Sequence, residues 1–253
     1  MPFAVRDSRG KPCPIRIESY TQGPPQPVGE SPWEFPDPRG AAPYGLVAEG
    51  GAYLPSAIVA AYRRGIFPWP HEDMPYAWFS PDPRAILPLD GLRVSRRLGR
   101  TIRSGRFWVT VDRAFTMVLE DCADRLEGTW IIPAYMDGYV ELHRLGWAHS
   151  FEVWLEEELV GGLYGIAVGA MFGAESMFSW VSDASKVAMA AMVQHCRAIG
   201  VELIDVQVVT PHTARMGAVE ISREEYLERL AAALQREARW WPGDGAGPSD
   251  REG

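Results

Sequence analysis

Two apolar stretches, MFGAESMFSW at 171–180 and LIDVQVV at 203–209, carry polar side chains where buried strands are expected. Glu175 interrupts a run of Met and Phe, and Asp205 and Gln207 stand two apart among Leu, Ile and Val. Strand side chains alternate between faces, so Asp205 and Gln207 are expected to share one face. Buried carboxylates are costly unless they are hydrogen-bonded, and many are retained for chemistry. The two stretches therefore predict a site, which we interpret as an acyl-transfer site.

Each of these polar residues also has a structural interpretation. A strand Asp often accepts hydrogen bonds from a loop, and a single Gln is more often structural than functional. Glu175 beside Ser176 fits a partly solvated strand end. Three polar groups in two apolar segments nevertheless favour function over these alternatives.

Length and composition limit the class of protein to which this chain can belong. At 253 residues, with 47% hydrophobic and 23% charged residues, the chain resembles an ordinary globular protein of one large or two small domains. The N-terminus lacks an apolar leader, and no apolar run approaches the ~18 residues that span a bilayer, so a cytoplasmic location without a membrane partner is expected. Cys13, Cys122 and Cys196 lack metal or redox spacing and are expected to be reduced thiols. The five histidines show no ligand spacing either, so we expect neither metal nor cofactor.

Positive charge is concentrated in one segment although the net charge is −8. Between residues 84 and 106 there are seven arginines and a single acid, Asp90. Five of them recur at spacings of three and four, which predicts one face of a helix with Ser95 as its N-cap. These are Arg93, Arg96, Arg97, Arg100 and Arg103. A solvated helix face usually mixes acids with bases, so we interpret this face as polyanion-binding.

The order of predicted elements indicates an α+β protein. Residues 1–44 hold ten of the 21 prolines and are expected to be extended or partly disordered, with one short strand near residues 15–17. Helices are predicted at 55–65, 113–123, 133–145, 185–199 and 211–216 and from 222 onward. Strands are predicted at 76–80, 84–89, 106–111, 148–155, 159–168, 170–179, 203–209 and 218–221. Asp183 and Ser222 are the expected N-caps of the helices that follow them, Ser222 as part of a capping box.

The predicted organisation has two lobes. A Pro-rich lead-in at 1–44 precedes an N-terminal α+β domain at 45–147, which carries the arginine helix. A catalytic domain at 148–239 follows, and residues 240–253 are expected to form a flexible tail.

Several long strings, in this order, resemble the leucyl/phenylalanyl-tRNA–protein transferases of bacteria. They include AAYRRGIFPWP (60–70), WFSPDPRAILPLDGLRVSRRL (78–98), LHRLGWAHSFEVW (142–154), ESMFS (175–179) and LIDVQ (203–207). The resemblance covers about residues 45–234. It implies a GNAT-like acyltransferase lobe in the C-terminal half.

The resemblance also implies an activity. Leu or Phe, with Met as a further candidate, would be moved from charged tRNA to the N-terminal Arg or Lys of acceptor proteins, which marks them for degradation by the N-degron route. We expect such an enzyme to be monomeric. Departures from the family pattern are GGAYLP at 50–55 in place of GGDLSP and WII at 130–132 in place of WIT, and both remove expected helix caps.

The chemistry follows from the substrates that the resemblance implies. An aminoacyl-tRNA ester is already activated, so transfer needs positioning, a proton acceptor and stabilisation of the tetrahedral intermediate. Asp205 is expected to orient Gln207 or to draw the amine proton through it, and Gln207 to place the nucleophile or the oxyanion. A ribose hydroxyl of the tRNA is the alternative proton shuttle. Glu175 suits the α-ammonium group of the aminoacyl ester.

Further substrate-binding residues complete the expected site. Trp69 and Trp130 offer flat surfaces on which the terminal adenosine can stack. Leu163, Phe172 and Met177 match positions that line the side-chain pocket in the family, and Tyr62 and Ser179 are assigned to substrate binding as well.

Three alternatives stay open to different degrees. An acetyl-CoA-dependent enzyme is disfavoured, because the stretch SWVSDASK at 179–186 lacks the glycines of a pyrophosphate loop. A non-catalytic tRNA-binding protein would use only the arginine helix. The same chemistry on a different amine or peptide acceptor is the third.

Overall fold

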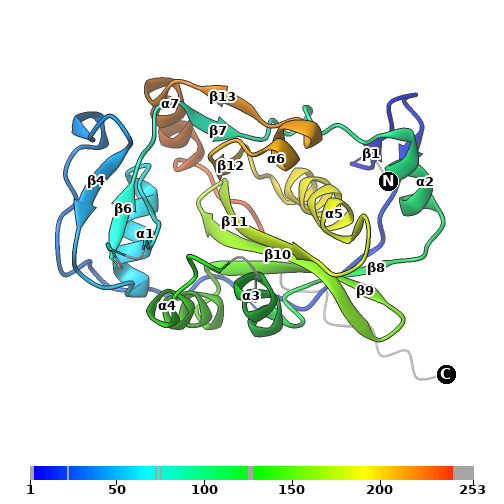
Figure 1. Cartoon of the computed structure of the whole chain (residues 1–253), viewed down its shortest axis with the longest axis horizontal. Coiled ribbons are helices and arrows are strands. Elements are labelled where there is room, and N and C mark those ends of the chain that lie inside the picture. The colour runs from blue at the N-terminus through cyan, green and yellow to red at the C-terminus, as the bar shows by residue number, and fades with distance from the viewer. Residues whose placement is uncertain (1–2, 22, 72, 75, 125–127, 242–253) are drawn as a thin grey trace.

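The computed structural model describes residues 3–21, 23–71, 73–74, 76–124 and 128–241. The strands of its main sheet are β3 (Ile17–Ser19), β7 (Arg84–Ile86), β8 (Trp108–Val111), β9 (Ala148–Leu155), β10 (Glu158–Val168), β11 (Met171–Ser179), β12 (Leu203–Gln207) and β13 (Val219–Ile221). They form an eight-stranded sheet in the order β13-β7-β12-β11-β10-β9-β8-β3 (Figure 1). The pairs β11–β12 and β3–β8 are parallel and all others are antiparallel.

Helices cover both faces of this sheet. On one face lie α3 (Phe115–Ala123) and α4 (Pro133–Arg144), with α1 (Pro55–Arg63) packed on α4. The opposite face is covered by α5 (Ala184–Ile199), as Figure 1 shows. Each face has its own buried cluster, so the sheet separates two hydrophobic cores.

The remaining elements surround the sheet. A three-stranded sheet of order β4-β6-β5 is built from β4 (Leu46–Glu49), β5 (Phe67–Pro68) and β6 (Ala77–Phe79). A two-stranded ribbon consists of β1 (Val5–Arg6) and β2 (Pro12–Cys13), and a 3-10 turn, η1, spans Pro38–Gly40. The other helices are α2 (Arg96–Arg103), α6 (Pro211–Met216) and α7 (Arg223–Ala233).

Every helix and strand predicted downstream of residue 50 is confirmed, with boundaries that shift by a few residues. The prediction for the Pro-rich lead-in is wrong in part. Residues 5–19 form three short strands, and β3 pairs with β8 as the edge of the large sheet. Gln194 fixes the same segment by exchanging hydrogen bonds with the backbone of Ile15 (3.1 and 2.6 Å). Strands of two or three residues are too short to leave a periodic pattern in the sequence.

The large sheet is continuous across the predicted division at residue 147. Three of its strands, β3, β7 and β8, come from before that position, and five come from after it. Of the predicted tail, residues 242–253 lie outside the described residues, while Trp240 is buried against the core.

Two of the three predicted N-caps, Ser95 and Ser222, are confirmed, and the third, Asp183, is wrong. The Ser95 hydroxyl accepts from the Leu98 N–H (3.1 Å), and the Ser222 hydroxyl accepts from the Glu225 N–H (3.2 Å). Asp183 precedes α5, but its side chain does not cap the helix, because it binds Lys186 and Arg97 instead. The positions before α1 and α4 carry no side-chain cap, and each of these helices starts with a proline at its first positions. Cys13, Cys122 and Cys196 are all buried.

Gly138 allows α4 to approach the chain that precedes α1. A Cβ at this position would lie 2.2 Å from the Tyr53 carbonyl oxygen and 3.1 Å from Ile58 Cδ1. Any larger residue must therefore push the two segments apart.

Gly138→Ala is expected to lower the free energy of unfolding by about 1–3 kcal/mol, because overpacking against backbone cannot be relieved by a rotamer change. Urea denaturation measures this effect. Gly40→Ala is the matched control, since its Cβ would meet no atom within 4 Å. Equal stability of the two variants would contradict the close approach.

Candidate active site

The parallel strands β11 and β12 pair over only three residues, Met171–Gly173 against Leu203–Asp205. Beyond this point both strands continue without pairing to each other, and their C-terminal halves line a pocket of about 550 Å³. The pocket therefore lies where two neighbouring parallel strands separate. It is lined by Glu175 and Gln207, two of the polar residues that the sequence singled out as unusual in apolar strands.

Glu175 lies at a β-bulge and is held by three tyrosines. Tyr164 pairs with Ser176 and Gly165 with Ala174, so Glu175 is the extra residue of β11. Its carboxylate accepts hydrogen bonds from the hydroxyls of Tyr62, Tyr135 (3.2 Å) and Tyr139 (2.8 Å), which project from α1 and α4. Burial raises the pKa of Glu175 to about 7, although the tyrosine hydroxyls favour the charged form.

Asp205 is fully buried in an ion pair with Arg84. The two side chains form a bidentate contact, Arg84 Nε to Oδ1 at 2.9 Å and Nη2 to Oδ2 at 2.6 Å. The Tyr226 hydroxyl donates to Oδ2 (2.9 Å), and the backbone N–H of Gln207 donates to Oδ1 (2.9 Å). All acceptor positions of the Asp205 carboxylate are thus occupied.

Gln207 lies at the end of β12 in a left-handed backbone conformation, with φ of 57°. A non-glycine residue in this region is strained by about 1–3 kcal/mol, and the hydrogen bond from its N–H to Asp205 helps to hold it there. The side-chain amide is satisfied when its nitrogen donates to the carbonyl oxygens of Ala174 (2.9 Å) and Val206 (3.1 Å). In that orientation both amide N–H groups are used within the protein.

The expectation that Asp205 and Gln207 share one face is wrong. The register between β12 and β7 shifts between these two residues, so strict alternation ends there. Gln207 lines the pocket, whereas Asp205 lies behind it against Arg84.

Most of the predicted substrate-binding residues meet in this pocket. Its walls include Leu163, Met177, Trp69, Trp130 and Ser179 together with Glu175 and Gln207. The Ser179 hydroxyl also accepts from the N–H of Ser185 at the start of α5 (3.2 Å).

Two predicted residues are placed elsewhere. Phe172 is fully buried and packs against Phe151 and Trp240 (ring centroids 6.1 and 5.1 Å apart), because the C-terminal segment covers that end of β11. It does not line the pocket. Tyr62 is also fully buried. Its hydroxyl donates to the Glu175 carboxylate, and its side chain does not line the pocket.

The arginine helix forms as predicted, but its five arginines do not make one unpaired face. Arg93 lies before α2, which begins at Arg96. Acids from distant segments pair with two of the others, Asp183 with Arg97 (3.4 Å) and Asp7 with Arg103 (3.0 Å). Arg96 and Arg100 are exposed. Spacing within one helix could not reveal acids that arrive from residues 7 and 183.

The chain also matches models of a known protein family. A family model described as leucyl/phenylalanyl-tRNA protein transferase matches residues 86–231, and a model of the N-terminal domain of the same proteins matches residues 51–82. The chain belongs to the leucyl/phenylalanyl-tRNA–protein transferase family.

Individual relatives of this family match most of the chain. It is 53% identical over 213 residues to the leucyl/phenylalanyl-tRNA–protein transferase of Anaeromyxobacter sp. (strain Fw109-5), a match that covers 81% of this chain and 91% of the relative. Identity is 49% over 207 residues to the protein of that name from Solidesulfovibrio magneticus, with coverages of 80% and 84%. It is 49% over 197 residues to the one from Pseudomonas fluorescens, with coverages of 77% and 87%.

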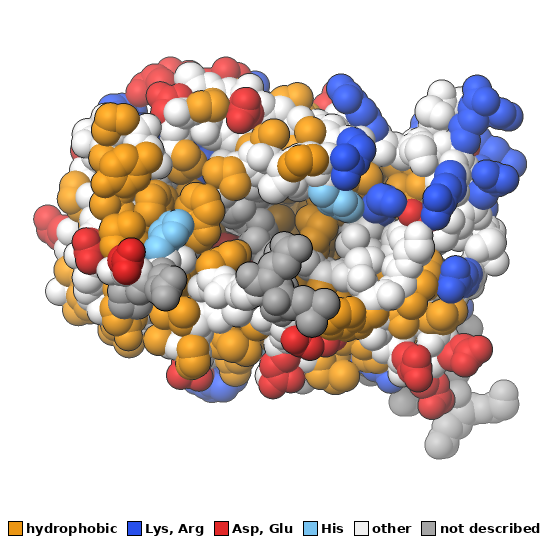
Figure 2. All heavy atoms as spheres, in the orientation of Figure 1, with side chains coloured by type: hydrophobic (Ala, Val, Ile, Leu, Met, Phe, Trp, Pro, Cys, Tyr) orange, Lys and Arg blue, Asp and Glu red, His pale blue; other side chains and the backbone are white. Residues whose placement is uncertain are grey.

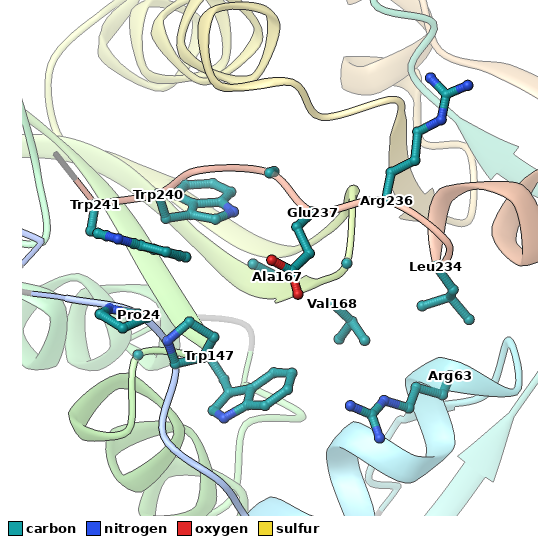
Figure 3. A pocket seen from close by; sticks show the side chains of 14 residues that line it. Pro24, Arg63, Trp147, Ala167, Val168, Leu234, Arg236, Glu237, Trp240 and Trp241 are labelled. Carbon is teal, nitrogen blue, oxygen red and sulfur yellow. The ribbon is translucent and has the colours of Figure 1, made fainter. Parts of the chain in front are cut away.

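A second large pocket, of about 490 Å³, lies near the hairpin between β10 and β11 and contains none of the predicted site residues (Figure 3). Trp147, Trp240 and Trp241 line it together with Arg63 and Glu237.

Within the described part of the chain, no three His, Cys, Asp or Glu side chains gather as metal ligands would. No helix in those ranges is long and apolar enough to cross a bilayer.

Sequence reasoning assigned Tyr62 to substrate binding and missed the other residues that hold the polar groups in place. Tyr135 and Tyr139 stand four apart on α4, a spacing that put them on one helix face and could have pointed to a shared partner. Arg84 and Tyr226 gave no such signal, because their partner Asp205 is 121 and 21 residues away in the chain.

The raised pKa of Glu175 predicts a pH-dependent stability. Between about pH 4.5 and pH 7 the folded state keeps a proton on Glu175 that the unfolded state has released, so this group's contribution to the free energy of unfolding falls as pH rises through that window. Glu175→Gln removes this dependence. The stability of the parent relative to the variant is therefore expected to fall by about 1–3 kcal/mol from pH 4.5 to pH 8, measured by urea denaturation. A constant difference across this range would show that Glu175 titrates normally.

Proposed function

We propose that this protein transfers Leu or Phe, with Met as a further candidate, from charged tRNA to the N-terminal Arg or Lys of acceptor proteins, and so marks them for degradation. One observation carries the proposal. A single pocket combines a carboxylate, a side-chain amide, apolar walls and two tryptophans. We also propose that the enzyme acts as a cytoplasmic monomer.

The walls of the pocket suit an unbranched or aromatic amino-acid side chain. Leu163 and Met177 pair across β10 and β11 and both line the pocket. Methionine adapts its shape to its partner, so one wall can accept either Leu or Phe. Trp69 and Trp130 at the same pocket offer stacking surfaces for the terminal adenosine, an interaction worth about 1–3 kcal/mol per base.

Glu175 is the proposed partner of the α-ammonium group of the aminoacyl ester. A substrate cation beside this carboxylate favours its charged form and so opposes the effect of burial. The tyrosines Tyr62, Tyr135 and Tyr139 fix the carboxylate in position.

Gln207 is the proposed contact to the attacking amine, through its amide oxygen. The amide nitrogen already donates to two carbonyl groups, which favours this acceptor role over donation to an oxyanion. Asp205 is a positioning residue in this scheme, because its carboxylate is saturated and reaches Gln207 through the backbone N–H. With no free carboxylate at Gln207, the proton would leave through water or a ribose hydroxyl of the tRNA.

The tRNA is proposed to bind on the side of α2. Arg93, Arg96, Arg97, Arg100 and Arg103 are assigned to its phosphates, with Arg97 and Arg103 also engaged in protein ion pairs. Phosphate contacts position a nucleic acid without reading its sequence.

We further propose a two-lobed organisation in which residues 148–239 form a GNAT-like lobe. Support comes from the antiparallel run β9–β10–β11, with β12 parallel to β11 and connected to it through α5. The other lobe would be the N-terminal domain at residues 45–147, which carries the arginine helix and includes the β4-β6-β5 sheet with α1.

Transfer is tested by incubating the protein with labelled Phe-tRNA and acceptor peptides that begin with Arg, Lys or Ala, without CoA. Label is expected on the Arg and Lys peptides and not on the Ala peptide. Label on an unrelated amine alone would favour the same chemistry with a different acceptor. Tight binding of Phe-tRNA without transfer to any amine would favour a non-catalytic tRNA-binding protein.

Gln207→Ala is expected to lower kcat by about 10²- to 10⁴-fold and to leave the affinity for charged tRNA unchanged. Asp205→Asn is expected to lower kcat as well, and the two effects are expected to combine less than additively. Kinetics at temperatures well below each Tm measure these effects, because removal of the Asp205 charge also leaves Arg84 unpaired and destabilises the fold by about 3–5 kcal/mol. Val209→Ala, at an exposed position next to this pocket and outside its lining, is the control. Parental kcat in folded Gln207→Ala would make Gln207 a structural residue.

A further inference from the structure

A smaller pocket adjoins the candidate active site and carries much of the positive charge on this face. Its volume is about 240 Å³, and it shares His212 with the active-site pocket. The charged residues that line it are Arg93, Arg97, Asp183, Lys186 and Arg215. Lys and Arg side chains gather over α2 and α6 in the space-filling view (Figure 2). Four cations and one carboxylate give this lining a net charge of +3 in a chain whose net charge is −8.

Asp183 forms ion pairs with two of these cations. Lys186 Nζ lies 2.7 Å from its Oδ1, and Arg97 Nε lies 3.4 Å from its Oδ2. Arg93 and Arg215 have no carboxylate within ion-pair distance among the described residues. The positive charges of the pocket are therefore not all neutralised, whereas a surface ion-pair network would balance each cation with an acid.

His212 and the start of α5 add donors that suit an anion. The Nε2 atom of His212 is buried and has no hydrogen-bond partner in the described ranges. Burial and the cations of Lys186 and Arg215 lower the pKa of His212, so its ring is neutral at pH 7 and can still donate one hydrogen bond. The helix α5 begins next to Asp183, with the positive end of its dipole at the pocket.

We propose that this pocket is a phosphate subsite, which holds a backbone phosphate of the tRNA 3′ end next to the terminal adenosine. The assignment rests on the proposed transfer from charged tRNA. The phosphates beside the terminal nucleoside are the anionic groups of that substrate that lie nearest to the reacting ester. An acceptor that begins with Arg or Lys is cationic at its reacting end and is repelled by the same residues.

The subsite differs from the arginine helix as a whole. Arg96 and Arg100 do not line it, while Lys186, Arg215 and His212 come from α5 and α6, outside the arginine segment. Arg96 and Arg100 are free to contact phosphates farther from the ester. The pocket then fixes the end of the chain that must enter the active site.

The test compares three Phe donors, in which Phe is esterified to adenosine, to the dinucleotide pCpA, or to full tRNA. The unaltered protein is expected to show a KM at least about tenfold lower for the pCpA donor than for the adenosine donor. The double variant Lys186→Gln/Arg215→Gln is expected to abolish this preference and to raise the KM for Phe-tRNA by about 10²-fold, tenfold for each cation. The salt dependence of tRNA binding is expected to weaken by about 0.7 in log–log slope for each phosphate that the variant no longer binds.

Two controls separate the subsite from charge and folding effects. The variant Arg16→Gln/Arg229→Gln removes two exposed cations outside the pocket and is expected to keep the donor preference. The KM for the adenosine donor is expected to stay unchanged in Lys186→Gln/Arg215→Gln, which shows an intact active site. Equal KM values for the two minimal donors in the unaltered protein, or an equal rise for both donors in the variant, would overturn the subsite. Absence of transfer from every donor would instead overturn the proposed function, and the assignment with it.

Discussion

The buried ion pair between Arg84 and Asp205 is the constraint on which much of the structure depends. Both side chains are inaccessible to solvent, and a buried charge without its partner would destabilise the fold by about 3–5 kcal/mol. Arg84 also donates to the Gly65 carbonyl oxygen (3.1 Å), and its guanidinium lies over the rings of Phe67 and Tyr226 (4.6 and 4.3 Å). Burial alone would lower the pKa of Arg84, but the Asp205 carboxylate outweighs it and raises that pKa above the ordinary value. One ion pair thus joins β7, β12, α7 and the turn after α1.

The same pair sets the geometry of the pocket. Asp205 accepts the N–H of Gln207, whose backbone then turns left-handed and brings its amide into the pocket. Glu175 lines the same pocket from β11, at a bulge held by tyrosines from α1 and α4. The two polar groups are linked, because the Gln207 amide nitrogen donates to the carbonyl oxygen of Ala174, next to Glu175. Both groups are fixed by contacts within the protein. Such preorganisation is what positioning chemistry requires.

The sequence predicted local features well and long-range ones poorly. Periodicity and caps located α1 to α7, because helices are encoded by neighbours in the chain. Polar residues in apolar strands pointed to Glu175 and Gln207, both of which line the pocket. Strict alternation placed Asp205 in the pocket too, and it failed because a register shift and a positive φ are not visible in a strand pattern.

The remaining errors have the same origin. The arginine face was judged by the acids within its own segment, yet Asp7 and Asp183 pair with two of its members from far away. Phe172 matched a pocket position, but the C-terminal Trp240 covers it. In the Pro-rich lead-in, β3 pairs with β8 and the nearby Ile15 is held by Gln194, and no local sequence pattern reveals either partner.

The path of the chain through the large sheet has a consequence for biosynthesis. β7 lies between β12 and β13, and the Arg84–Asp205 contact spans 121 residues. While the chain is still being made, β7 lacks both of its sheet neighbours, and Arg84 lacks its carboxylate partner, until residues 203–221 have left the ribosome. Nucleation must therefore begin elsewhere, and the antiparallel hairpins β9–β10–β11 offer the shortest loops to close. Until the last strands arrive, unpaired edges from the first half of the chain remain open to misassociation, which makes protection by chaperones valuable for this topology.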